Sequence, residues 1–296
     1  MKNLIFIFLT MVTISSFAQK PAIEGHRGFR GHYPENTLIA FEKALELGVS
    51  TIELDVIISK DRQVVVSHEP YMNPLFCIKP NGEKVLMQEM KELNLYEMNY
   101  SSIKEFDSGS NGNPNFPEQA KVKTYKPLLR EVLVLGESFR KKTGRAIYYN
   151  IEIKSEEKEY GISQPNTVKE FSDLVSKEVF NYVQPQYIIL QSFDFNVLKF
   201  WHQSIQNGLI PQVELSALVE DLSPEDTVKE LGFLPGTYSP YYKILDQNTV
   251  NRTHSLGMKV VPWTINLRED IIKFAKLGVD AIITDYPNRA EEFLEK

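Results

Sequence analysis

The sequence contains a single cysteine, Cys77, and no excess of positive charge. One thiol cannot form an internal disulfide, and it excludes a CxxC metal or redox site. The 33 Lys and Arg residues against 39 Asp and Glu residues give a net charge of −6, so no global positive field is present to hold a nucleic acid. The GxSxG serine elbow, the HExxH zinc motif and the P-loop are also missing. Nucleic acid is therefore not an expected partner, and catalysis by a serine elbow is not expected.

Only one apolar run stands out, at residues 4–14. Its 11 residues (4 to 14) fall well short of the roughly 20 that a membrane-spanning helix needs. The run follows a short positive start and ends in the small-x-small pattern Ser16-Phe17-Ala18, which is typical of a cleaved signal peptide. We expect residues 1–18 to be removed and residues 19–296 to form one exported domain, in a bacterial periplasm, with no stable membrane anchor.

Strand-like runs alternate with amphipathic stretches through the rest of the chain. Eight strand candidates cover residues 22–28, 51–58, 146–154, 187–193, 211–218, 237–242, 259–266 and 281–285. Helical stretches between them include residues 37–48, 127–144, 167–183, 196–206 and 268–278. Eight such units predict an α/β fold, a (β/α)8 TIM barrel. A GxGxxG turn is absent after the first strand, which argues against an open dinucleotide-binding sheet.

One segment, residues 70–126, breaks this alternation. It is rich in Asn, Pro, Gly and Ser and has only short helical patterns. Because it follows the second strand, we expect an insertion that emerges at the carboxyl end of the barrel, where active sites lie and loops often cap them. The alternative is an exposed excursion without a role.

Acidic residues interrupt two of the predicted strands. Glu53 and Asp55 lie two positions apart, so strand alternation puts both carboxylates on one face. The same alternation groups Asn150, Glu152 and Lys154 on one face of another strand. Carboxylates that converge in a barrel must be protonated or must bind a cation.

Three acids without cysteine favour a hard cation, Ca²⁺ or Mg²⁺, over zinc. The proposed ligands are Glu53, Asp55 and Glu152. The alternative is that Lys154 and Arg27 neutralise these acids as buried ion pairs without a metal.

Two histidines lie where a strand meets a loop. His26 closes the first strand, and His68 ends the β-branched run Val64-Val65-Val66-Ser67-His68. A single histidine at such a place is commonly structural. Two of them beside Arg27 and paired acids indicate acid–base chemistry on a phosphoester.

The same residues occur in motifs that resemble the glycerophosphodiester phosphodiesterase family. The resemblance covers residues 22–290, and it includes the insertion after the second strand. The most specific motifs are His26-Arg27-Gly28, Pro34-Glu35-Asn36-Thr37 and Glu53-Leu54-Asp55-Val56, followed by His68, Glu152-Ile153-Lys154, Gln191-Ser192-Phe193-Asp194, Trp263-Thr264 and Asp285-Tyr286-Pro287. Glu69 follows His68 where the family usually has Asp.

The resemblance implies a role for each of these site residues. His26 and His68 would be the acid–base pair, and Arg27 and Lys154 would hold the phosphodiester. The three acids would ligate one divalent cation, Ca²⁺ or Mg²⁺. Trp263, at the end of the seventh predicted strand, either packs on the glycerol carbons of the substrate or is a packing residue of the barrel rim.

The implied reaction is metal-dependent hydrolysis of a small glycerophosphodiester to sn-glycerol 3-phosphate and an alcohol. A lysophospholipase D-like activity on lipids and a catalytically silent phosphodiester-binding protein are the alternatives. Phe76, Phe106 and Phe116 in the insertion keep the lipid alternative open. No oligomeric state follows from the sequence.

Overall fold

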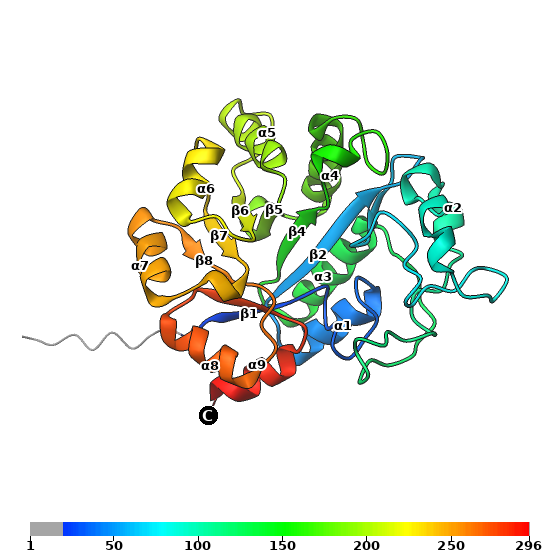
Figure 1. The fold of residues 1–296 in the computed structure, drawn as a ribbon, viewed down its shortest axis with the longest axis horizontal. Coiled ribbons are helices and arrows are strands. Elements are labelled where there is room, and N and C mark those ends of the chain that lie inside the picture. The colour runs from blue at the N-terminus through cyan, green and yellow to red at the C-terminus, as the bar shows by residue number, and fades with distance from the viewer. Residues whose placement is uncertain (1–19, 296) are drawn as a thin grey trace, which may run out of the picture.

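The computed structural model describes residues 20–295, which form a barrel of parallel strands surrounded by helices (Figure 1). The eight barrel strands within these residues are β1 (Ala22–Gly25), β2 (Thr51–Ile58), β4 (Tyr148–Ile153), β5 (Ile188–Ser192), β6 (Glu214–Val219), β7 (Thr237–Pro240), β8 (Lys259–Val260) and β9 (Ala281–Thr284). They pair in the order β8-β7-β6-β5-β4-β2-β1-β9. The predicted TIM barrel is confirmed.

The barrel closes between β8 and β9 through an irregular seam. The amide of Asp280 donates to the carbonyl of Val260 at 3.0 Å, and the amide of Ile283 donates to Pro262 at 3.1 Å. The amide of Ile265 then donates to Ile283 at 3.0 Å. The seventh predicted strand, residues 259–266, is a regular strand over only two residues, because Pro262 has no N–H with which to continue a ladder. These three backbone hydrogen bonds close the barrel where the regular strand pairing ends.

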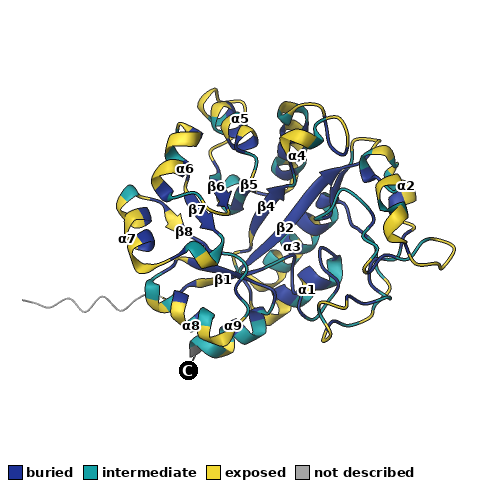
Figure 2. Cartoon of the chain, viewed as in Figure 1, coloured by how far each residue is buried: buried dark blue, intermediate teal, exposed yellow. Residues whose placement is uncertain are grey.

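The surrounding helices are α1 (Leu38–Leu47), α3 (Leu129–Thr143), α4 (Val168–Tyr182), α5 (Phe195–Gln206), α6 (Pro224–Leu231), α7 (Gln247–Leu256), α8 (Arg268–Leu277) and α9 (Pro287–Glu295). Figure 2 shows buried residues along the strands and exposed residues on the outer sides of the helices. The five helices predicted from periodicity match α1, α3, α4, α5 and α8 to within two residues at each end. Helices α6, α7 and α9 were not among the predicted stretches.

Strand β2 is longer than its neighbour β1 and carries a hairpin. The last residue of β1, Gly25, pairs with Ile52, so β2 continues past the end of β1. Strand β3 (Val64–Val66) then folds back antiparallel on the end of β2. The amide of Ser67 donates to the carbonyl of Asp55 at 3.0 Å. This return of the chain sets His68 next to Asp55.

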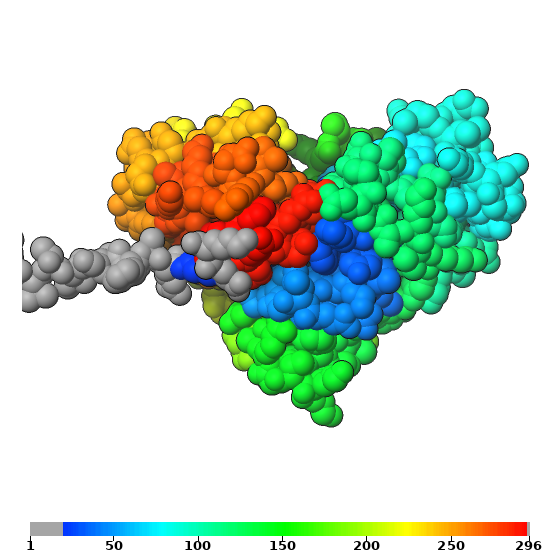
Figure 3. All heavy atoms as spheres, turned by 90° about the horizontal axis from the view of Figure 1, so that it is seen from below, coloured from blue at the N-terminus to red at the C-terminus, as the bar shows by residue number. Residues whose placement is uncertain are grey.

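The segment between β3 and α3 forms a small side structure with its own apolar cluster. It contains three short helices, η1 (Met87–Glu92), η2 (Leu95–Glu97) and α2 (Tyr100–Ile103). Met72, Cys77 and Leu95 are fully buried there. The segment projects from one side of the barrel, in cyan, in Figures 1 and 3. Its role as a cap of the active site stays a prediction.

The first and last described residues lie at the same side of the barrel. The ammonium of Lys20 is 2.8 Å from a carboxylate oxygen of Glu291 in α9, and β1 pairs with β9 at four positions. Figure 3 shows the surface of the last helix, in red, next to that of the N-terminal part, in blue. The predicted signal peptide, residues 1–18, lies outside the described residues. Within residues 20–295, no helix is long and apolar enough to span a membrane.

Candidate active site

Three carboxylates from two adjacent strands meet at the carboxyl end of the barrel. Alternation in β2 turns Glu53 and Asp55 to the same side, and the register sets Asp55 opposite Glu152 of β4. One ligand atom from each of the three acids lies within 4.8 Å of the others, and all three residues are buried. The predicted acids thus come together in a group that could hold a metal ion. Its donors are all oxygen, which suits Ca²⁺ or Mg²⁺.

Burial and mutual repulsion oppose the ionisation of two of these three acids. Burial, and then the negative charges of Asp55 and Glu152, raise the pKa of Glu53 well above its usual range. Burial also raises the pKa of Glu152. Asp55 differs, because although burial opposes its ionisation, the nearby positive charges led by Arg27 lower its pKa. A bound cation would favour the ionised form of all three acids.

Two basic residues lie beside the acids, but they do not neutralise all of them. Arg27 Nη1 is 2.7 Å from Glu35 and its Nε is 3.3 Å from Asp55. Lys154 Nζ is 2.7 Å from Glu152 and 4.0 Å from Asp55.

Glu53 has no such partner. It accepts hydrogen bonds from the backbone amide of Arg27 at 2.9 Å and from Gln191 Nε2 at 3.0 Å. Among the described residues, no cationic side chain lies within ion-pair distance of Glu53. The alternative in which Lys154 and Arg27 neutralise every acid therefore leaves Glu53 uncompensated.

A tight turn after β1 aims the Arg27 amide at Glu53. Arg27 and Gly28 both have positive φ angles, 51° and 85°. A Cβ atom on residue 28 would lie 2.7 Å from the carbonyl carbon of Ala40 in α1. Glycine is required there by both the backbone angle and the close approach of the helix.

His26 is held by a carboxylate from the opposite end of the chain. Its Nδ1 lies 2.6 Å from Oδ1 of Asp285, which follows β9. Asn266 fixes that carboxylate by donating from Nδ2 to Oδ2 at 2.7 Å. Burial lowers the pKa of His26, and the charge of Asp285 partly offsets this effect. The contact occupies Nδ1 and leaves Nε2 as the atom for proton transfer.

His68 is oriented in a similar way by its neighbour. Its Nδ1 lies 3.1 Å from Oε1 of Glu69. Although burial opposes ionisation, the hydrogen bond and charge of His68 lower the pKa of Glu69. The replacement of the family's usual Asp by Glu at residue 69 therefore retains a carboxylate beside the imidazole.

Trp263 lies in a group of aromatic rings near Lys154. Its indole N–H donates to the carbonyl of Ser239 at 2.9 Å. Its ring centroid is 5.3 Å from that of Phe193 and 5.4 Å from that of Tyr241. Lys154 Nζ lies 5.6 Å from the Phe193 ring. Trp263 thus packs against other rings of the rim, and its contact with substrate stays a prediction.

Several residues that complete the site were quoted in motifs but had no predicted role. Asn36, with a positive φ of 55°, donates from Nδ2 to Asp55 at 2.8 Å. Glu35 joins Arg27 to Arg30, whose Nε is 2.7 Å away. Asn266 also completes the site but lay in no quoted motif; the others, described above, are Gln191 and Asp285. The motif residues among them could be found in the sequence only because they belong to a family motif. Spacing along the chain does not reveal contacts between distant segments.

The comparisons with known proteins agree with this geometry. The sequence model of the glycerophosphoryl diester phosphodiesterase family matches residues 26–289. The chain belongs to this family. A glycerophosphodiester phosphodiesterase of Bacillus altitudinis is 30% identical over 278 residues, which cover 93% of this chain and 98% of the relative. The chain is therefore an enzyme of the phosphoric diester hydrolase class.

Solved structures of the glycerophosphodiester phosphodiesterases share the fold. A Silicibacter pomeroyi protein assigned to this class has a TM-score of 0.82 and 28% identity, with 93% of each chain covered. An Oleispira antarctica phosphodiesterase in complex with the product sn-glycerol-3-phosphate has a TM-score of 0.72 and 20% identity, covering 93% of this chain and 97% of that one. At 20% identity the second likeness supports the fold alone.

Proposed function

We propose that this enzyme hydrolyses small glycerophosphodiesters to sn-glycerol 3-phosphate and an alcohol, with one divalent cation, Ca²⁺ or Mg²⁺, held by Glu53, Asp55 and Glu152. The observation that carries the proposal is the uncompensated Glu53 carboxylate within a buried group of three acids. The product bound to the Oleispira phosphodiesterase is consistent with this reaction. When bound, the cation would supply positive charge against the phosphoryl oxygens.

Arg27 and Lys154 are proposed to bind the phosphodiester. Both side chains are largely buried and already contact carboxylates of the site. Because their positions are fixed before substrate binds, they can stabilise charge that develops on the phosphoryl oxygens without reorganisation. Their carboxylate partners hold the two cations in place.

His26 and His68 are proposed to transfer the protons. Each has its Nδ1 beside a carboxylate oxygen, of Asp285 and Glu69 respectively. One imidazole takes a proton from the attacking oxygen, either of water or of the glycerol 2-hydroxyl, while the other protonates the leaving alkoxide. If the 2-hydroxyl attacks first, diesters that lack it should be turned over poorly even when they bind.

The proposed substrates are water-soluble diesters such as glycerophosphocholine and glycerophosphoethanolamine. A lipid substrate would need exposed apolar residues near the site. Phe76 and Phe106 of the insertion are instead buried in its own cluster, and Phe116 packs under the guanidinium of Arg30 at 4.4 Å. This packing removes the three phenylalanines as support for the lysophospholipase D-like alternative.

The test compares deacylated and monoacylated substrates side by side. Release of glycerol 3-phosphate is measured with purified enzyme and added Ca²⁺ or Mg²⁺, and we expect a higher kcat/KM for the deacylated diester. A preference for the monoacylated lipid would move the function to lysophospholipase D. Tight binding without turnover of either substrate would indicate the silent binding protein.

Export is proposed from the N-terminal residues alone. Cell fractionation with N-terminal sequencing of the mature protein should find the enzyme in the periplasm, beginning at Gln19. An intact Met1 in the cytoplasmic fraction would contradict this proposal.

A further inference from the structure

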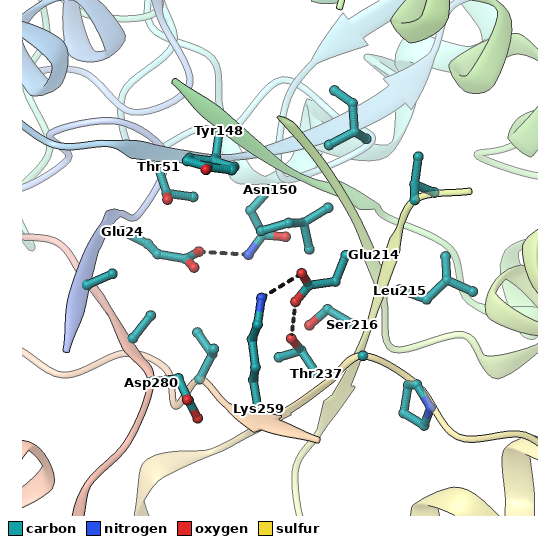
Figure 4. A pocket seen from close by; sticks show the side chains of 18 of the residues that line it. Glu24, Thr51, Tyr148, Asn150, Glu214, Leu215, Ser216, Thr237, Lys259 and Asp280 are labelled. Carbon is teal, nitrogen blue, oxygen red and sulfur yellow. Dashed lines mark hydrogen bonds and ion pairs between the residues drawn. The ribbon is translucent and has the colours of Figure 1, made fainter. Parts of the chain in front are cut away.

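The lower half of the barrel lumen contains a large open space. A cavity of about 1480 Å³ opens at the end of the barrel where the strands begin, opposite the carboxylate group. TIM barrels usually fill this region with bulky branched side chains. Here the inward positions include the small residues Ala22, Thr51, Thr237 and Ala281. Figure 4 shows the polar side chains that surround the cavity.

One layer of this lumen contains polar side chains with unsatisfied hydrogen-bonding capacity. In a TIM barrel, side chains from alternate strands share a layer. The strand register groups Glu24, Asn150, Ser216 and Val261 in this way, and all four line the cavity. Asn150 Nδ2 donates to Oε2 of Glu24 at 2.8 Å. Oδ1 of Asn150 and Oγ of Ser216 are buried without a hydrogen-bond partner.

These unpartnered groups are deeply buried. Asn150 is 2% exposed and Ser216 is 1% exposed. Both side chains turn toward the cavity in Figure 4. A buried polar atom without a partner is costly, and such atoms are normally satisfied by a ligand or by ordered water.

The layer also contains an acidic side chain, Glu24, that forms no ion pair within the described residues; burial raises its pKa to about 7, so it is negatively charged above that pH. Glu24 is 4% exposed, and none of the described cationic side chains lies within ion-pair distance of it. Lys259 lies one layer below and forms an ion pair with Glu214, whose Oε2 is 2.7 Å from Lys259 Nζ. Asp280 at the rim is paired with His254 at 2.9 Å. Above pH 7, where Glu24 is ionised, its charge is therefore available to a cationic ligand, and Lys259 acts on it only through longer-range Coulombic attraction.

We propose that this layer binds the ammonium group of a small primary amine. An alkylammonium offers three N–H donors and one positive charge. Glu24, Asn150 and Ser216 offer three oxygen acceptors, one of them anionic. A neutral polyol would leave the Glu24 charge unmatched, and a quaternary ammonium would have no N–H for the two neutral acceptors. The rest of the amine would extend into the wider cavity toward its mouth.

The experiment titrates the full mature protein with ethylammonium chloride in an amine-free buffer, monitored by protein NMR. We expect saturable shifts of the backbone amides of Glu24, Asn150 and Ser216. Tetramethylammonium, which keeps the charge but has no N–H, and ethanol, which is neutral, should bind at least about tenfold more weakly. Equal binding of all three compounds, or no saturable shift with ethylammonium, would overturn the proposal and indicate a cavity that holds only water.

Three variants locate the binding. Glu24→Gln keeps the size of the side chain but removes its charge, so it should weaken ethylammonium binding by at least about tenfold. Ser216→Ala removes one acceptor and should weaken it by a smaller factor, which gives a second test should Glu24→Gln not fold. Glu42→Gln, which neutralises an exposed carboxylate on α1, should bind like the wild type. Unchanged binding by both lumen variants would contradict the assignment.

Discussion

Nδ1 of His26 lies 2.6 Å from Oδ1 of Asp285, a residue 259 positions later in the chain. This contact fixes the ring and favours its protonated form. Asp285→Asn should lower kcat by at least about tenfold, because the imidazole loses its orienting anion. The limb of the pH–rate profile that reports His26 should move to lower pH, since removal of the negative charge lowers the His26 pKa further.

A purely structural role for Asp285 would give a different result. The variant would then lose thermal stability without a shift in the pH–rate profile. Measuring both the melting temperature and the pH dependence of kcat separates the two cases.

The two histidines should be needed for chemistry and not for folding. His26→Ala and His68→Ala should each slow the chemical step by at least about 10²-fold, the usual contribution of a positioned acid or base. A substrate with a good leaving group should rescue only the variant that lacks the general acid, because that leaving group needs no proton. Large losses of melting temperature with small kinetic effects would instead assign structural roles.

Removal of metal should abolish activity reversibly. Exhaustive dialysis against a chelator should inactivate the enzyme, and Ca²⁺ or Mg²⁺ should restore it, because three buried acids need a cation to stay ionised together. Glu53→Gln and Glu152→Gln should weaken metal binding measured by calorimetry, whereas Glu42→Gln on the exposed face of α1 should not. Full activity after dialysis would refute metal dependence.

Glu24 should make the protein less stable as the pH rises. Burial raises the pKa of Glu24 to about 7, whereas an unfolded Glu titrates near roughly 4.3. The folded state therefore binds more protons between these values. The stability from Glu24 is fully present below about pH 4 and is lost as the pH rises through 7.

Glu24→Gln removes this pH dependence. Above pH 7 the variant should be more stable than the wild type by about 3 kcal/mol, and the difference should shrink as the pH falls toward 4. Denaturant unfolding at several pH values measures it, with Glu42→Gln as the control. A constant difference at every pH would contradict the assigned titration.

Strand periodicity was enough to predict the carboxylate group, because the alternation of side chains within a strand can be read from neighbouring residues in the sequence. Glu53 and Asp55 share a face through alternation within one strand, and parallel strands end at one edge, which brings Glu152 alongside. The positions of His26 and His68 followed from strand ends in the same way. The family resemblance added the roles, which spacing alone left open.

Other parts of the site depend on contacts that no local pattern encodes. Asp285 reaches His26 only after the barrel closes, and Asn36 reaches Asp55 only because the turn after β1 brings it there. In the sequence, the hairpin that brings His68 back to Asp55 could be recognised only as a run of β-branched residues. The open lumen around Asn150 was also not predicted, because it depends on which small side chains share a layer.

The pairing of β1 with β9 joins the start of the barrel to its end, from Ala22 with Ala281 to Gly25 with Thr284. During synthesis, β1 leaves the ribosome well before its partner β9 is made. Pairing across so long a stretch of chain is slow and comes late in folding. In a nascent or truncated chain that lacks β9, β1 has no partner on one side and the barrel is open beside His26. We therefore expect catalytic competence to arise only after β9 has been made, and no proteolytic fragment without this strand should be active.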